Sequence, residues 1–370
     1  MSEAGRGRRV LFLDLLIPEP DRHASSLRSV QLLTLLRDWG WQVDFLHAAV
    51  SEPPAGADAL ERLGVRALPS GTLEAIEAYV RDAAAGYDLI YLAWVRLSRP
   101  LLPVIRQAAP GRPVLYDSLD VNYLREYREA RLTGNARTLA RALRTKESER
   151  AVLLDAEASL AITPADARVL RALAPDARLF TVGMWTDPDP VERRPEPASL
   201  LFVGNLGAPH NHDCALYMMR EVMPLLRPRV ADLKLVLAGP DHNDIRRKID
   251  GPDILLTGWQ ADLRPLFERA TLFLAPLRFG SGLKGKMLQA MAHGLPIVAS
   301  AIAAEGMPLV EGRDFLLADS APAAAAAVER LLADPGLGRE LAARAMETLR
   351  QHYGRESVER PFAEALASIV

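Results

Sequence analysis

The chain has 370 residues, of which 49% are hydrophobic and 25% are charged, and its formal net charge at pH 7 is −2. This length suits two domains better than one hydrophobic core, and the small net charge gives no basic field for non-specific nucleic-acid binding. The single cysteine, Cys214, excludes a disulfide framework and is typical of a cytoplasmic protein. The apolar run at residues 10–17 is too short for a membrane span and contains Asp14, so it predicts a first strand rather than an export signal.

The first half alternates apolar strand patterns with helical patterns, which is typical of a parallel α/β sheet. Residues 10–16 predict a buried strand, a leucine stripe predicts a helix that ends at Gly40, and residues 42–46 predict the second strand. Further strands are expected at residues 65–68, 89–94, 114–116, 159–163 and 179–182. Helices are expected between them, for example at residues 73–84 and 137–155.

Two polar loops follow predicted strands in this half, at the edge where open parallel sheets bind their ligands. Their candidate residues are His23, Ser25, Arg28, Asp117, Asp120 and Asn122. The alternative for the first loop is a serine N-cap with solvated charges. The alternative for the second is a helix start with acidic residues in its first turn.

The predicted helix at residues 137–155 carries several arginines interleaved with acidic residues such as Glu147 and Glu149. This mixture is typical of a solvated helix face. Docking on an anionic lipid surface is the alternative, so a peripheral membrane contact stays open.

Residues 181–198 contain prolines and charges without periodicity, which predicts a domain boundary near residue 185. The expected division is a first domain at residues 1–185, a second at 186–353, and a helix at 354–370 that packs back on the first. Asp187 and Asp189 have the D-x-D spacing of some metal-binding enzymes, but they lie between prolines rather than at a strand end. We therefore expect no metal site there, and we read residues 210–213, with two histidines, as a turn or helix cap.

The strand–helix alternation restarts after this linker. Strands are expected at residues 199–204, 233–239, 254–258, 272–276, 297–300 and 315–318. Helices are expected at residues 213–226, 241–249, 262–269, 286–293, 321–333, 337–352 and 356–370. Two successive Rossmann-like domains predict a ligand site in the cleft between them.

A glycine-rich loop follows the strand expected at 272–276. Three glycines within six residues allow a sharp bend and a close approach to a ligand, and cations lie beside them; the residues are Arg278, Gly280, Gly282, Lys284, Gly285 and Lys286. A helix then begins and ends at Gly294. Such a strand, loop and helix present a helix N-terminus to a phosphate group, and a simple tight turn is the alternative.

These motifs resemble the donor-binding domain of GT-B-fold glycosyltransferases, in particular the retaining glycosyltransferase family 4. The resemblance covers about residues 200–353 and is carried by FVGNLGAPHNHDCAL, LVLAGP, ILLTGW, RATLFLAPLRFGSGLKGKMLQAMAHGLPIVAS and AEGM. The first half matches more weakly, through PDRHASSLR and VLYDSLDVNYLREYREA. The resemblance implies an α/β protein of the GT-B fold, with two Rossmann-like domains that face each other across a cleft.

The resemblance also implies an activity: transfer of a sugar, as in hexosyltransferases, from a nucleotide-sugar donor to the hydroxyl group of a glycan or small molecule. Anomeric retention is expected, with no metal and no other cofactor. The implied donor-binding residues are Gly204, Asn205, His210, Arg278, Gly280, Ser281, Gly282, Leu283, Lys284, Lys286 and Gln289. Asp120, Asn122 and Lys286 are expected at the reacting centre, and His23, Ser25, Arg28 and Asp117 on the acceptor side.

The sequence departs from the family pattern at several of these positions. Ser281 and Gln289 stand where the family commonly has two glutamates, and Asn205 and His210 stand where it commonly has an arginine and a lysine. The charge centre is therefore expected in the loop that contains Lys286. Two alternatives follow for the function: a catalytically silent partner protein, or a sugar-nucleotide epimerase on the same fold.

Overall fold

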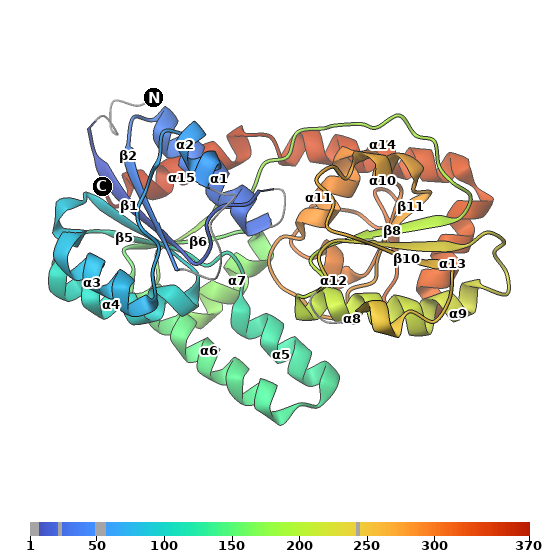
Figure 1. Cartoon of the computed structure of the whole chain (residues 1–370), viewed down its shortest axis with the longest axis horizontal. Helices are drawn as coiled ribbons and strands as arrows, with labels where there is room; N and C mark the ends of the chain where they lie inside the picture. The colour runs from blue at the N-terminus through green and yellow to red at the C-terminus, as the bar shows by residue number, and fades with distance from the viewer. Residues whose placement is uncertain (1–6, 21–23, 49–56, 242–244) are drawn as a thin grey trace. The chain divides into compact units, whose positions relative to one another are not determined.

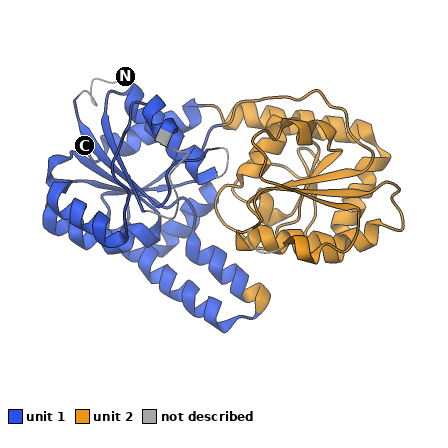
Figure 2. Ribbon diagram, viewed as in Figure 1, with its two compact units in different colours: residues 1–130, 134–185, 355–370 blue, residues 131–133, 186–354 orange. Residues whose placement is uncertain are grey.

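The structure is a computed structural model of the chain, and it describes residues 7–20, 24–48, 57–241 and 245–370. It divides into two compact units, which Figure 2 shows in different colours. Unit 1 comprises residues 1–130, 134–185 and 355–370, and unit 2 comprises residues 131–133 and 186–354. The chain thus leaves unit 1 after Trp185 and returns to it at Arg355.

Unit 1 is built on a parallel sheet with the strand order β3-β2-β1-β4-β5-β6-β7 among the described residues (Figure 1). The strands are β1 (Arg9–Asp14), β2 (Gln42–His47), β3 (Arg66–Ala67), β4 (Leu89–Ala93), β5 (Val114–Asp117), β6 (Ala158–Ala161) and β7 (Leu179–Thr181). The chain builds outward from β1 to β3 and then crosses back to β4. The β1–β4 pair is therefore the switch point of a doubly wound sheet, where such folds bind ligands at the carboxyl ends of the strands.

Helices cover both faces of this sheet. They are α1 (Ala24–Asp38), α2 (Ala57–Arg62), α3 (Leu73–Ala83), α4 (Val95–Ala108), α5 (Asn122–Thr133), α6 (Ala136–Asp155), α7 (Pro164–Leu173) and α15 (Glu356–Ala367). Because side chains alternate along a strand, Val10 and Phe12 of β1 pack in one buried cluster and Leu11 and Leu13 in the other. Helices α1 and α15 contribute to the first cluster, whereas α3 and α4 contribute to the second (Figure 1).

Unit 2 repeats the same topology with the parallel strand order β10-β9-β8-β11-β12-β13. The strands are β8 (Ser199–Val203), β9 (Lys234–Ala238), β10 (Ile254–Gly258), β11 (Leu272–Ala275), β12 (Ile297–Ala299) and β13 (Leu316–Leu317). The helices are α8 (Pro209–Tyr217), α9 (Met223–Leu226), α10 (Arg264–Arg269), α11 (Gly285–Ala292), α12 (Ala301–Ala304), α13 (Ala321–Ala333) and α14 (Pro335–His352). One continuous apolar core surrounds the sheet, and its switch point lies between β8 and β11.

The structure differs from the sequence predictions in several elements, including the following three. Strand β1 ends at Asp14 rather than residue 16, because the Asp14 carboxylate accepts hydrogen bonds from the N–H groups of Leu15 and Leu16 and turns the chain. The helix predicted from residue 213 already begins at Pro209 and contains a π-helical turn at Met218–Val222. This turn precedes Pro224, which has no N–H group to continue the regular hydrogen-bond ladder. The helix predicted at residues 241–249 is a short 3₁₀ turn at Ile245–Lys248, and residues 242–244 lie outside the described chain.

Candidate functional site

Two loops lie at the switch point of unit 2, at the carboxyl ends of β8 and β11. One leads from β8 into α8, and the other is the glycine-rich loop from β11 into α11. Because β8 and β11 are hydrogen-bonded neighbours, both loops begin at the same edge of the sheet. All but one of the sequence-predicted donor residues lie in these loops and the first turns of the two helices; the exception, Gln289, lies further along α11.

Hydrogen bonds fix the backbone of the first loop, and a glycine leaves open space beside it. Gly204 donates its N–H to Ala238, and the Asn205 side chain accepts from the N–H of Gly207 at 2.9 Å. A Cβ atom on Gly204 would lie 2.9 Å from Nδ2 of Asn211 and 3.2 Å from Nζ of Lys286, so glycine keeps this space open.

Lys286 is the central cation of the site. It lies in the first turn of α11, and its ammonium group donates to Oδ1 of Asn211 in the first turn of α8. The same nitrogen lies 4.7 Å from the centroid of the Phe202 ring. Within the described part of the chain no carboxylate forms an ion pair with it. Burial disfavours the charged form and lowers the pKa of Lys286 from 10.5 to about 8.

A half-buried cation whose charge is desolvated and that has no acidic partner among the described residues is unusual, because proteins normally pair such charges. Here it lies beside an open glycine backbone and in the first turn of a helix, where a negative charge is favoured. This arrangement suits an anion that arrives from solution, such as a phosphate or diphosphate group.

The other two predicted cations have different surroundings. Nζ of Lys284 donates to the carbonyl oxygen of Gly282 at 2.9 Å, and this lysine is only 6% exposed. Its bond therefore supports the loop. Arg278 is exposed, and its Nε donates to Asp213 of α8 at 2.9 Å while its guanidinium lies over the Tyr217 ring at 4.8 Å. The Arg278–Asp213 pair thus ties the two loops together.

The remaining donor-side residues line the same edge. The side chains of four of them are half-buried, namely His210, Ser281, Leu283 and Gln289, while Gly280 and Gly282 are buried. Gly282 has a φ of +68°, in the left-handed region that favours glycine. Sequence reasoning did not select Asn211 or Asp213, although both lie in the first turns of the helix that follows β8.

In unit 1, Asp120 and Asn122 share one arginine. Arg125 forms an ion pair with Asp120, and its Nη2 donates to Oδ1 of Asn122 at 2.9 Å. The backbone N–H of Asn122 donates to buried Glu149 at 2.7 Å, which places Glu149 at the N-terminus of α5. Asn122 is only 5% exposed, whereas Asp120 is half-buried. Asp120 is therefore the more accessible of the two predicted residues.

The acceptor-side prediction needs a correction at Arg28 and Asp117. Both side chains are fully buried and form a bidentate ion pair, with Nε of Arg28 2.7 Å from Oδ2 of Asp117. Arg28 also donates to the carbonyl oxygens of Val182 and Gly183. These contacts join α1, β5 and the segment after β7, so the pair supports the fold and presents no charge to a substrate. Ser25 is half-buried at the start of α1, and His23 lies outside the described residues.

A second buried carboxylate, Asp14, lies at the switch point of unit 1. It accepts from the indole N–H of Trp94 at 2.9 Å and from the Ser29 hydroxyl at 2.7 Å. Burial raises the pKa of Asp14 to about 6, although its hydrogen bonds lower it. In the sequence, Asp14 served only as an argument against an export signal, and Trp94 was not predicted as a site residue.

Of the two linker aspartates, Asp189 has protein partners. Asp189 forms an ion pair with Arg264, and its carbonyl oxygen lies 2.7 Å from Nδ1 of His293. Across the described residues, no group of three or more histidine, cysteine, aspartate and glutamate side chains is placed to hold a metal ion. Along the same residues, no helix combines the length and apolar composition that a membrane span needs.

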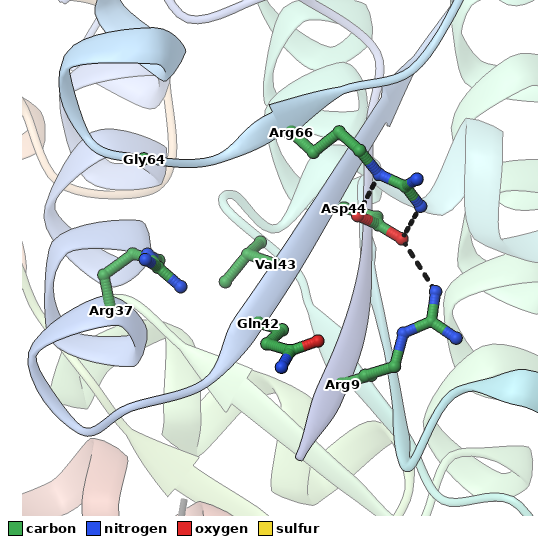
Figure 3. Close-up of a pocket in the computed structure, with 7 residues that line it drawn as sticks. All are labelled: Arg9, Arg37, Gln42, Val43, Asp44, Gly64 and Arg66. Atoms are coloured by element: carbon green, nitrogen blue, oxygen red, sulfur yellow. Dashed lines mark hydrogen bonds and ion pairs between the residues drawn. The ribbon is translucent and has the colours of Figure 1, made fainter. Parts of the chain in front are cut away.

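A shallow cavity of about 410 Å³ lies elsewhere, at the amino ends of β1, β2 and β3 (Figure 3). Its lining residues are Arg9, Arg37, Gln42, Val43, Asp44, Gly64 and Arg66. Arg9 and Arg66 both donate to Asp44, which also accepts from the Tyr87 hydroxyl at 2.6 Å. This cavity is therefore at the opposite end of the strands from the candidate residues of unit 1. The charges of its two arginines that donate to Asp44 are neutralised in part by that carboxylate.

The chain is similar to known glycosyltransferases in sequence and fold. Residues 197–334 match the family described as Glycosyl transferases group 1. A lipopolysaccharide core biosynthesis glycosyltransferase, LpsE of Rhizobium meliloti, is 29% identical over 117 residues. That match spans 31% of this chain and 34% of the relative, so it covers about a third of each protein.

Solved structures match the whole fold. Sucrose-phosphate synthase from Thermosynechococcus elongatus has a TM-score of 0.75 with 18% identity, covering 97% of this chain and 98% of the other. HepE of Anabaena in complex with UDP and glucose has a TM-score of 0.73 with 17% identity, covering 98% and 100%. Residues 197–334 are therefore a glycosyltransferase group 1 domain, and the chain has the GT-B fold.

Proposed function

We propose that the protein transfers a sugar from a nucleoside-diphosphate sugar to a hydroxyl acceptor, with retention at the anomeric carbon and without a metal ion. The observation that supports this proposal is the position of Lys286. This cation lies at the switch point of unit 2, beside a glycine backbone, and has no carboxylate partner among the described residues. The diphosphate of the donor is the anion that best suits this place.

The proposed role of Lys286 is to stabilise the leaving group. As the glycosidic bond of the donor breaks, the diphosphate gains negative charge, and a preorganised cation together with backbone N–H groups lowers the energy of that state. Partial burial of Lys286 strengthens this effect, because the interaction is less screened than in water. The acceptor oxygen forms its bond to the anomeric carbon on the face that the diphosphate leaves, and its proton passes to the departing phosphate oxygen.

Uridine diphosphate is the nucleotide that we propose to test first. HepE, whose fold matches over almost the whole chain, was solved with UDP and glucose and also with UDP-glucose. The half-buried Gln289 of α11 is the proposed contact for the ribose hydroxyls, since its amide offers both an acceptor and donors.

The test is product formation. The purified chain is incubated with UDP-, GDP-, dTDP- and ADP-sugars and a panel of mono- and oligosaccharide acceptors, and release of nucleotide is followed together with new glycosides by mass spectrometry. The anomeric configuration of the product by NMR tests retention. A new glycoside whose formation depends on Lys286 supports the proposal, whereas epimerised donor without a new glycosidic bond contradicts it.

A silent partner protein is the second candidate, because Ser281 and Gln289 replace the acidic pair that is common in family 4. The two readings differ in one result. A silent partner binds the nucleotide sugar without releasing nucleotide, even when every acceptor in the panel is present.

A further inference from the structure

The carboxyl edge of unit 1 has its own switch point, and one tryptophan occupies it. Strand β4 ends at Ala93, beside the end of β1, and Trp94 follows directly. The indole packs on the buried cluster of one sheet face, and Trp94 is partly rather than fully buried. A partly exposed aromatic ring at a ligand-binding edge is a feature that packing alone does not require.

The backbone of Trp94 is strained. Its φ is +64° and its ψ is 129°, a conformation that a bulky side chain rarely adopts. Hydrogen bonds hold it there: its N–H donates to Asp117 at 3.2 Å, and its carbonyl oxygen accepts from Leu97 and Ser98. Strain that neighbouring contacts maintain is concentrated at functional sites in proteins, where it orients a group that acts on a ligand.

The ring is also fixed at its polar end. The indole N–H donates to Oδ1 of Asp14 at 2.9 Å, and Ser29 holds the other carboxylate oxygen at 2.7 Å. With its N–H engaged inside the protein, the part of the indole that faces solvent offers a rigid apolar surface. Such a surface binds ligands at a small loss of conformational entropy.

We propose that Trp94 is the stacking platform for the acceptor, that the acceptor presents a pyranose ring to it, and that Asp14 is the positioning residue of this platform. The C–H groups on one face of a pyranose pack on the indole, while its hydroxyl groups remain free for polar contacts. Half-buried Ser25 and Asp120 lie after the carboxyl ends of strands in the same sheet. This inference rests on the proposed glycosyltransferase function, since it assigns the class of acceptor.

The experiment measures pyranoside binding in the absence of donor. Methyl glucosides, galactosides, mannosides, rhamnosides and N-acetylglucosaminides are titrated up to about 100 mM, with ligand-observed NMR as the readout, because this signal does not depend on which tryptophans a variant retains. The variants are Trp94→Gly, which removes the ring and accepts the positive φ, and Trp94→Phe, which keeps an aromatic face. Trp39→Phe is the matched control, because Trp39 is a half-buried tryptophan of unit 1 that packs on Phe362.

We expect at least one pyranoside to bind the wild type and Trp39→Phe alike and to lose about tenfold or more in affinity in Trp94→Gly. Trp94→Phe should retain part of the binding. Asp14→Asn keeps an acceptor oxygen for the indole and should bind nearly as wild type, whereas Asp14→Ala should bind more weakly. Circular dichroism melting confirms that each variant is folded.

Three results would overturn the inference: no pyranoside binds the wild type, a pyranoside binds Trp94→Gly as tightly as the wild type, or only an alkyl alcohol such as octanol binds. The affinities for UDP, GDP, dTDP and ADP are measured in parallel on the same variants. Because the proposed nucleotide site lies in unit 2, absence of binding by every nucleotide in the wild type would contradict the proposed function, while failure of pyranoside binding alone contradicts only the role of Trp94.

Discussion

Replacing Lys286 with methionine should stabilise the ligand-free protein while it removes donor use. The lysine ammonium is drawn beside Asn211 and the Phe202 ring, and burial lowers its pKa from 10.5 to about 8. At pH 7 the folded and unfolded chains both carry this proton, so the folded chain alone bears the cost of a desolvated charge. Methionine has a similar length and no charge, so it removes that cost.

The magnitude follows from the pKa. A fall from 10.5 to about 8 corresponds to about 3.5 kcal/mol at about 1.4 kcal/mol per pH unit. The side chain is half-buried, and solvent screening reduces the effect, so we expect the free energy of unfolding at pH 7 to rise by ~1–2 kcal/mol. For a domain of this size this is an increase in Tm of about 2–8 °C.

The same shift predicts a pH dependence. Between about pH 8 and 10.5 the unfolded chain binds the proton of Lys286 and the folded chain does not. Stability rises with pH wherever the unfolded state binds more protons, so Lys286 adds stability as the pH increases across this window. The methionine variant should lack this contribution.

The assay is thermal and urea unfolding without ligand, near pH 7 and again near pH 9.5, together with kcat/KM for the donor. Lys234→Met is the matched control in unit 2, because Lys234 is paired with Glu196 at 2.8 Å and partly exposed. We expect Lys234→Met to change stability by less than about 1 kcal/mol and Lys286→Met to lower kcat/KM by about 10²–10³-fold. A Lys286→Met protein that is less stable than wild type, or that retains wild-type kcat/KM, would refute the reasoning.

Three further predictions concern other parts of the chain. Gly239→Ala should cost more than about 3 kcal/mol of stability, because φ is +134° there and a Cβ atom would lie 2.0 Å from the carbonyl oxygen of Gly204. Gly258→Ala has open space around its Cβ position and should cost only about 1–2 kcal/mol. Equal urea midpoints for the two variants would contradict this difference. Burial raises the pKa of Glu149 to about 7, so the folded chain binds more protons than the unfolded chain between about pH 4.5 and 7. Glu149 therefore lowers stability as the pH rises through that window. Glu149→Gln should remove this pH dependence of the unfolding free energy in urea titrations, and an unchanged pH dependence would show that another group causes it. Activity should persist in EDTA, and a complete loss that Mg²⁺ or Mn²⁺ restores would return a metal role to Asp187 and Asp189.

Most of the fold was readable from the sequence because its strands are apolar runs between glycine and proline breaks. Strand β10 (Ile254–Gly258) and helix α13 (Ala321–Ala333) lie where these patterns predicted them. The π-helical turn at Met218–Val222 was not predicted, since the apolar spacing of residues 213–226 fits a regular helix equally well.

The candidate site was readable only in part. A glycine-rich loop with lysines has a local pattern, so Lys286 was selected, but its partner Asn211 lies in another helix 75 residues earlier. Arg28 and Asp117 were assigned to an acceptor site because polar residues near strand ends suggest one. Their burial as a pair 89 residues apart became visible only in the folded chain. Trp94 was missed for a related reason, because an apolar residue after an apolar strand gives no sign of backbone strain.

The central claim is that Lys286 binds the diphosphate of the donor. Its most direct test is isothermal titration calorimetry of UDP into the wild type and into Lys286→Met, with GDP, dTDP and ADP titrated separately in the same way. The account predicts that one nucleoside diphosphate binds the wild type and binds Lys286→Met at least about tenfold more weakly, since one charge-assisted contact is lost. Equal affinities for the two proteins would contradict the placement of the diphosphate at Lys286, and the absence of binding by every nucleotide would contradict a nucleotide-sugar site in unit 2.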